Sequence, residues 1–246
     1  MRAVVDGCGC FPTGRHYAGI AHLLRAIIRG LAEEFASDSV WNDVPVALID
    51  VETTGRDASV DRVIEVGIAV GRNGAVIARY NWLIHPGIAI PDESKAIHGI
   101  SDDDVKDSPS FAVIAHEIAA ALQGCVPAAY NAAFDRAFLA NEFGRAGPRE
   151  GTLPPALRRD VDWIDPLVWA REIQREEKSK ALSEVASRLG VALENAHRAS
   201  DDAEAALLVI YSLAVDARVP KAYGALIQEQ KRLGLLQQDE RRFWKS

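Results

Sequence analysis

The sequence VALIDVETTG, residues 46–55, places two acidic residues directly after a run of four apolar ones. A short apolar run of this kind predicts a buried strand, and side chains along a strand alternate between its two faces. Asp50 and Glu52 are therefore expected on the same face at the end of this strand. Two neighbouring carboxylates repel each other unless a cation lies between them, so this stretch predicts a cation site.

Two later stretches supply groups of the same chemistry. Residues 130–135 read YNAAFD, and residues 197–202 read HRASDD at the start of an apolar helical run. With the first stretch they contribute four carboxylates and one imidazole, those of Asp50, Glu52, Asp135, Asp202 and His197. This donor set is typical of a two-metal hydrolytic site. Two alternatives stay open: an Asp at a helix start is commonly an N-cap, and Asp201 competes with Asp202 as ligand.

The hydrophobic pattern predicts an α/β protein with a mixed sheet flanked by helices. Strands are expected at 46–52, 63–70, 76–84 and 126–130. Between the second and third of them, Asn73 and Gly74 predict a tight hairpin. Helices are expected at 17–36, 91–97, 111–122, 134–143, 166–177, 181–189 and 201–214.

Composition limits the class of protein. The 246 residues, 48% hydrophobic and 26% charged, suit one domain with extensions. No apolar stretch reaches the roughly 18 residues that span a bilayer, and an acidic residue stands where a secretory signal has its apolar run, so a cytoplasmic location without a membrane partner is expected. The net charge of −7 argues against tight binding of long duplexes. It favours a short single-stranded 3′ end, or delivery to DNA by a partner.

The motifs D-x-E-T-T-G, N-A-x-F-D and H-x-A-x-x-D occur here in the order that the DnaQ-like (DEDDh) 3′-5′ exonucleases have them. The chain most resembles the proofreading (epsilon) subunit of bacterial DNA polymerase III. Further matching stretches are AIHGIS (96–101), IDPL (164–167) and LSEVASRLGV (182–191). The resemblance implies an RNase H-like fold with a mixed five-stranded sheet. It divides the chain into an N-terminal helical extension (1–43), an exonuclease domain (44–216) and a C-terminal helical extension (217–246).

The resemblance also implies a role for each residue of the donor set. Two divalent cations, Mg²⁺ or Mn²⁺, are expected, with Asp50 bridging both. Glu52 and Asp202 would complete the site of the first cation, and Asp135 would hold the second, partly through water. His197 would take the proton from the attacking water, a task that suits imidazole near neutral pH.

By the same resemblance, Thr53, Thr54 and Gly55 cradle the terminal nucleotide, while His98 and Ile100 lie near its sugar and base. The expected function is hydrolysis of single-stranded DNA ends to 5′-mononucleotides, in DNA replication or repair. One alternative is an exoribonuclease resembling oligoribonuclease and RNase T. Another is a non-catalytic, polymerase-accessory binding module. A DNA polymerase or clamp is an expected partner, because residues 230–236, QKRLGLL, weakly resemble clamp-binding peptides.

Overall fold

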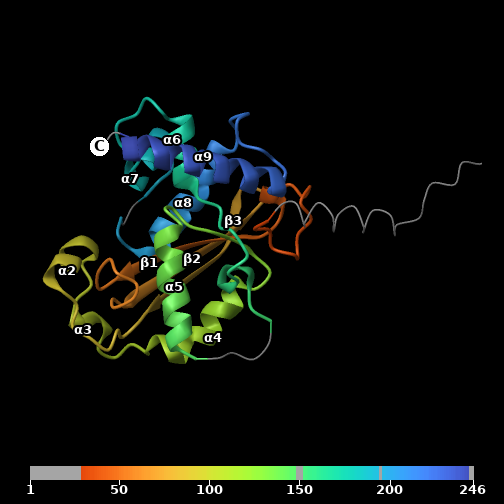
Figure 1. Ribbon diagram of the computed structural model, residues 1–246. Helices are drawn as coiled ribbons and strands as arrows, with labels where there is room; N and C mark the ends of the chain where they lie inside the picture. The colour runs from red at the N-terminus through yellow and green to blue at the C-terminus, as the bar shows by residue number, and fades with distance from the viewer. Residues whose placement is uncertain (1–28, 148–151, 194–195, 244–246) are drawn as a thin grey trace, which may run out of the picture.

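The computed structural model describes residues 29–147, 152–193 and 196–243, and this part of the chain contains a mixed four-stranded sheet. The strands are β1 (Val46–Thr53), β2 (Val63–Arg72), β3 (Ala75–Leu83) and β4 (Val126–Ala128), in the spatial order β3-β2-β1-β4. The first three form an antiparallel meander, and β4 runs parallel to β1 (Figure 1). Asn73 and Gly74 have φ angles of 54° and 77°, as a tight hairpin requires. The predicted hairpin is therefore confirmed.

Helices surround this sheet (Figure 1). The described ones are α2 (Asp92–His98), α3 (Asp102–Val105), α4 (Phe111–Leu122), α5 (Ala133–Arg145), α6 (Pro166–Ile173), α7 (Leu182–Arg188), α8 (Ala199–Leu213) and α9 (Tyr223–Phe243), with 3₁₀ helices η1 (Trp41–Asp43) and η2 (Pro155–Leu157). The helices expected from 91–97 to 201–214 are present as α2 and α4 to α8, and the short α3 was not predicted. Among the described helices, none combines the length and hydropathy needed to cross a bilayer.

Strand β1 is buried on both faces because helices cover both sides of the sheet. Val46 and Leu48 belong to a core shared with α6, α8 and α9. Ala47 and Ile49 belong to a second core, shared with α4 and α5. Since side chains alternate along a strand, the continuation of the first face leads to Asp50, on the side covered by α8.

The predicted helix over 17–36 is wrong for the part that the structure describes. Residues 29–36 form turns and one bridge, with Gly30 paired in parallel to Val161. The amide of Ala32 donates a hydrogen bond to the hydroxyl of Tyr223, 3.2 Å away. Apolar side chains of this stretch still pack against the core, so their spacing reflects burial and not a helix. Residues 17–28 lie outside the described residues.

The predicted fifth strand is also wrong for the described residues. Beyond β4 there is one isolated parallel bridge, between Ala128 and Ile164. Asp165 caps α6, and Pro166 is the first residue of that helix. The ladder ends at once because proline has no amide hydrogen to donate and the helix begins there.

Helix α9 occupies most of the predicted C-terminal extension and contributes to the first core. The side-chain amide of Gln230 donates to the carbonyl of Trp163 at 2.8 Å and accepts from the amide of Asp165 at 2.8 Å. Gln230 is 8% exposed. This glutamine, which begins the stretch resembling a clamp-binding peptide, is therefore occupied inside the protein.

Candidate active site

The acidic residues at the end of β1 face the beginning of α8. In the antiparallel ladder Asp50 pairs with Gly67 of β2. A Cβ atom on Gly67 would lie 2.1 Å from the carbonyl carbon of Ala199, so only glycine permits this approach of the helix backbone. The close approach brings Asp202, in the first turn of α8, to the end of β1.

Glu52, His197 and Asp202 form a cluster of metal-ligating side chains. One ligand atom of each lies within 4.8 Å of the ligand atoms of the other two. The amide of His197 donates to Oδ2 of Asp202 at 3.0 Å. His197 has a φ of 69°, a left-handed conformation that is uncommon for residues other than glycine. Of the two neighbouring aspartates, Asp202 is the member of this cluster.

Asp135 reaches the end of β1 from α5, which packs on the other face of the sheet. It is 3% exposed, and its carboxylate accepts a hydrogen bond from the amide of Val51 at 3.2 Å. The N-cap of α5 is Ala132, so Asp135 is not a cap. Burial, followed by the charge of Asp50, raises the pKa of Asp135 well above its ordinary value. The two carboxylates are thus close enough to repel.

The turn that leads into α5 is held by Asp165. Its carboxylate accepts from the amides of Asn131 at 3.0 Å and Ala132 at 3.2 Å, and also from that of Leu167 at 2.9 Å. Asn131 has a φ of 72°, so the turn departs from ordinary backbone geometry. Asp165 therefore fixes the direction in which α5 starts and presents Asp135.

Burial and mutual repulsion disfavour the ionised carboxylates. Burial, followed by the charges of Asp202 and Glu65, raises the pKa of Asp50 to about 8. The pKa of Glu52 is raised to about 9 by burial and then by the charge of Asp50. Burial also raises the pKa of Asp202. A divalent cation relieves such repulsion, and carboxylate oxygens are the ligands that Mg²⁺ and Mn²⁺ prefer. The donor set therefore fits a divalent metal.

A further buried carboxylate belongs to Glu65, which the motifs did not reveal. Glu65 is 0% exposed and lies opposite Glu52 in the ladder. It accepts hydrogen bonds from Asn81, Arg198 and the amide of Ala199. The only sequence signal was an acidic residue within the apolar run of β2. Its partners lie 16 to 134 residues away along the chain, so local patterns cannot identify them.

A pocket of about 680 Å³ opens beside Glu52. Its lining comes from the end of β1, the following loop, α2 and the start of α5: Val51, Glu52, Thr53, Thr54, Gly55, Arg56, Pro91, Glu93, Ser94, Ile97, His98, Asn131 and Phe134. Four of the five predicted substrate residues are in this lining. Ile100 is not, because it is 4% exposed and packs in a small core. Its amide donates to Nδ1 of His98 at 3.0 Å, so Ile100 instead orients that ring.

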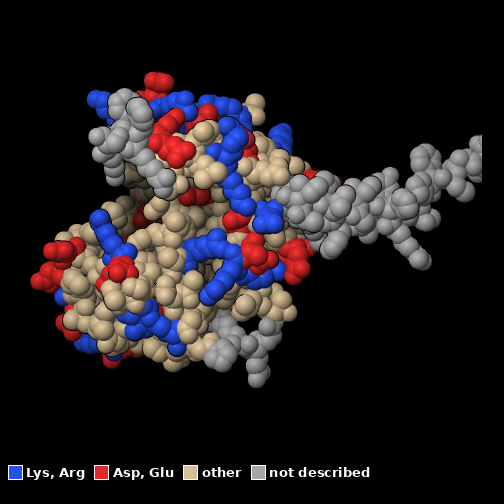
Figure 2. Space-filling model, viewed as in Figure 1, with Lys and Arg blue, Asp and Glu red and all other residues tan. Residues whose placement is uncertain are grey.

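Arg56 and Phe134 are pocket residues to which the sequence reasoning gave no role in binding substrate. Phe134 packs against Phe138, with ring centroids 4.8 Å apart, and it also lines the pocket. Arg56 is the one Lys or Arg in the described lining. Over the face shown in Figure 2, Lys and Arg are interspersed with Asp and Glu. This face therefore has no broad basic area.

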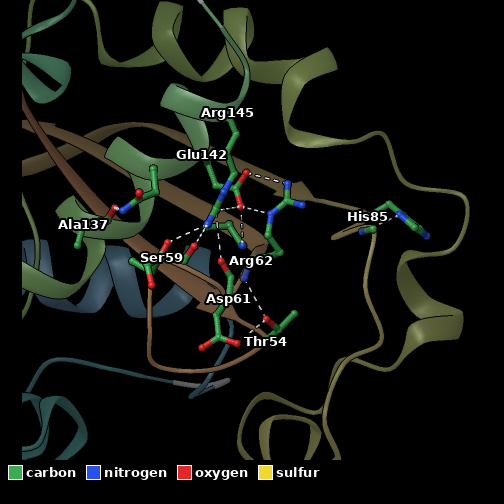
Figure 3. A network of polar contacts seen from close by, with 12 residues as sticks. Thr54, Ser59, Asp61, Arg62, His85, Ala137, Glu142 and Arg145 are labelled. Atoms are coloured by element: carbon green, nitrogen blue, oxygen red, sulfur yellow. Dashed lines mark hydrogen bonds and ion pairs between the residues drawn. The ribbon is translucent and has the colours of Figure 1, made fainter.

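The loop between β1 and β2, which forms one wall of the pocket, is tied to α5 by a buried carboxylate (Figure 3). Glu142 is 1% exposed and accepts from Arg62 at 2.7 and 3.0 Å and from Arg145 at 3.1 Å. Arg145 also donates to three carbonyls of the loop, those of Ala58, Ser59 and Asp61. Oγ1 of Thr54 accepts from the amide of Arg62 at 3.0 Å. These contacts hold the loop in one shape.

The family model described as Exonuclease (RNase_T) matches residues 47–210. The 3′-5′ exonuclease DinG of Staphylococcus saprophyticus is 32% identical over 157 residues, which cover 64% of this chain and 17% of that protein. A PolC-type DNA polymerase III of Streptococcus suis is 32% identical over 181 residues, covering 74% of this chain and 12% of the polymerase. The chain thus spans less than a fifth of these curated relatives.

Solved structures share the fold. E. coli exonuclease I in a zinc-bound complex with single-stranded DNA has a TM-score of 0.63 at 20% identity, over 76% of this chain and 43% of that one. Exonuclease X in complex with 5′ overhanging duplex DNA has a TM-score of 0.56 at 20% identity, over 74% of this chain and 98% of the other. The predicted RNase H-like fold is confirmed, with four described strands where five were expected.

Proposed function

The chain belongs to the exonuclease family whose model matches residues 47–210, and from this premise we propose that it is a metal-dependent 3′-5′ exonuclease acting on single-stranded DNA ends. Its predicted membership of the DnaQ-like exonucleases is confirmed by the family match and the two curated relatives. The observation that carries the proposal is the cluster of Glu52, His197 and Asp202, whose ligand atoms lie within 4.8 Å of one another and whose Glu52 also lines a pocket.

In this proposal the carboxylates would hold two divalent cations. Glu52 and Asp202 would hold one, Asp135 would hold the other, and Asp50 would contribute to both. When bound, the cations lower the pKa of a water and stabilise the charge on the leaving oxygen. The raised pKa values of Asp50 and Glu52 support this assignment, because buried carboxylates crowded together are best stabilised by bound positive charge.

His197 is the general base that takes the proton of the attacking water. Its backbone is fixed by the hydrogen bond to Asp202, and His197 is an exposed member of the metal-ligating cluster. The same geometry permits a second role, that of a metal ligand. The two roles differ in their effect on metal affinity: loss of a ligand weakens metal binding, whereas loss of a base removes turnover alone.

The pocket receives the terminal nucleotide. A volume of about 680 Å³ lies within the usual range of roughly 300–1,000 Å³ for small-molecule sites. Thr54 and His98 offer polar contacts, Phe134 offers an aromatic face, and Arg56 offers a charge for phosphate. Single-stranded DNA is favoured because the structural relatives include an exonuclease I bound to it. A DNA polymerase is the proposed partner, since one curated relative is itself a polymerase.

The test is degradation of a 5′-labelled single-stranded DNA oligomer, and of a matched RNA, with Mg²⁺ or Mn²⁺. The proposal expects a ladder shortening from the 3′ end of the DNA, abolished by EDTA and by His197→Ala. His116→Ala, which removes an exposed histidine of α4, is the matched control and should remain active. Degradation of RNA alone would indicate an exoribonuclease. If neither oligomer is degraded, the enzyme proposal is wrong and a binding module remains.

Calorimetric titration with Mn²⁺ then separates the two roles of His197. Unchanged affinity in His197→Ala supports the base, and a large loss of affinity assigns the imidazole as a ligand.

A further inference from the structure

We propose that Glu65 is a positioning residue for His197, which it holds in place through Arg198 and Ala199. The inference rests on the proposed function, in which His197 is the general base. Glu65 belongs to β2, whereas the three residues 197–199 form the entry to α8. A residue of the sheet thus controls a turn that is remote in sequence.

Both oxygens of the Glu65 carboxylate are used in this contact. Oε1 accepts from Nη2 of Arg198 at 2.7 Å and from its Nε at 3.3 Å. Oε2 accepts from the amide of Ala199 at 3.1 Å. Glu65 is fully buried, while the side chain of Arg198 is 46% exposed. The carboxylate is therefore a fixed anchor, and charge-assisted hydrogen bonds of this kind are among the strong ones.

The turn needs such an anchor because its backbone is unfavourable. His197 has a φ of 69°, which costs free energy for a residue with a Cβ atom. Arg198 is the N-cap of α8 and makes no side-chain cap hydrogen bond. Glu65, in strand β2, substitutes for the missing cap by accepting a hydrogen bond from the amide of Ala199. Without this bond the turn can relax, and the imidazole moves with it.

The sheet register relates this anchor to the rest of the site. Glu65 is the partner of Glu52 in the antiparallel ladder, and paired residues on one face lie about 4.5–5.5 Å apart at Cβ. Glu52 in turn faces His197 in the metal-ligating cluster. Glu65 holds the backbone next to His197, and its ladder partner Glu52 faces the imidazole, so two paired residues of the sheet place the ring.

The test measures single-nucleotide release by Glu65→Gln, which keeps the size of the side chain and one acceptor oxygen. We expect kcat to fall roughly 10–100-fold, the range found for residues that hydrogen-bond to metal-ligating histidines, with KM within twofold of wild type. Leu213→Ala, at the opposite end of α8 and 2% exposed, controls for general destabilisation and should keep its kcat.

A second readout does not depend on activity. The imidazole ¹H–¹³C signal of His197, assigned by its absence in His197→Ala, should shift or broaden in Glu65→Gln and in Arg198→Met but not in Leu213→Ala. A wild-type kcat in Glu65→Gln, or an imidazole signal that is unchanged in this variant, would each overturn the inference. An inactive wild-type protein would refute the proposed function instead, and the imidazole signal would still decide whether Glu65 positions the ring.

Discussion

The close contact between Gly67 and the start of α8 leads to a sharp prediction for Gly67→Ala. The added methyl group would lie 2.1 Å from the carbonyl carbon of Ala199 and 2.3 Å from the amide nitrogen of Ser200. These are backbone atoms, so no side-chain rotation relieves the clash. The helix must move by about 0.9 Å before the contact with Ala199 reaches even 3.0 Å.

This displacement acts directly on the site because His197 and Asp202 flank the contact. A misplacement of about 1 Å at a reacting centre costs on the order of 100-fold in rate. The strain also lowers the free energy of unfolding, by roughly 1–3 kcal/mol, as overpacking usually does. We therefore expect kcat for 3′-end hydrolysis to fall about 100-fold in Gly67→Ala, in a protein that still folds.

Gly71→Ala is the matched control. Gly71 lies on the same strand and faces the same helix, but an added Cβ there meets the side-chain ends of Tyr211 and Leu207, at 2.5 and 2.7 Å. Those side chains can rotate, and they lie farther along α8. The assay is single-turnover hydrolysis of labelled DNA together with urea denaturation. If Gly67→Ala retains kcat within twofold of wild type, the close approach does not position the site and the reasoning is refuted.

Three further predictions concern charge. The pKa values of Asp50 and Glu52 are raised from ordinary values near 4 to about 8 and about 9, so between these limits the folded protein binds more protons than the unfolded chain. Metal-free protein should therefore lose stability as pH rises from 5 to 9, and Mg²⁺ should raise Tm more at pH 9 than at pH 5. A Tm in EDTA that does not change between pH 5 and pH 9 contradicts this prediction. Arg56→Gln should raise KM about tenfold, because it removes one charged hydrogen bond to the DNA. It should also lower the slope of log affinity for DNA against log salt concentration by about 0.7 in magnitude. Arg175→Gln, which lines a different cavity, should change neither, and an unaltered slope in Arg56→Gln would remove Arg56 from the phosphate contacts. Glu142→Gln should lower the free energy of unfolding by roughly 1–3 kcal/mol in urea denaturation, since two arginines lose their buried partner; a wild-type midpoint would show that the loop is held by other contacts.

Local patterns predicted those parts of the fold whose cause is local. Alternation in residues 46–53 predicted the shared face of Asp50 and Glu52, and Asn73 with Gly74 predicted the hairpin. Both depend on backbone sterics within a few residues. The apolar spacing of residues 29–36 led to the wrong prediction of a helix, because burial of these side chains against the core produces the same spacing without a helix.

Long-range contacts account for what was missed. Glu65 and Arg198 are separated by 133 positions; Glu65 lies outside the recognised motifs, and Arg198 occupies a variable position of the third one. The contact between Glu65 and Arg198 depends on where the whole chain packs, so no local window of sequence contains the information for it. The pairing at Ile164 stays a single bridge for a local reason, because the next helix begins immediately.

The sequence by itself determined the chemistry available to this protein: which carboxylates and which imidazole it carries, in which order, and hence its family. Only the tertiary structure decided how they meet. Packing of α8 on Gly67 brought Asp202, which the motif had already indicated, to Glu52 and His197, and burial raised the pKa values of the carboxylates. The reason is physical: side-chain identity and strand alternation are local properties, whereas distance, desolvation and charge repulsion arise only when remote segments are packed together.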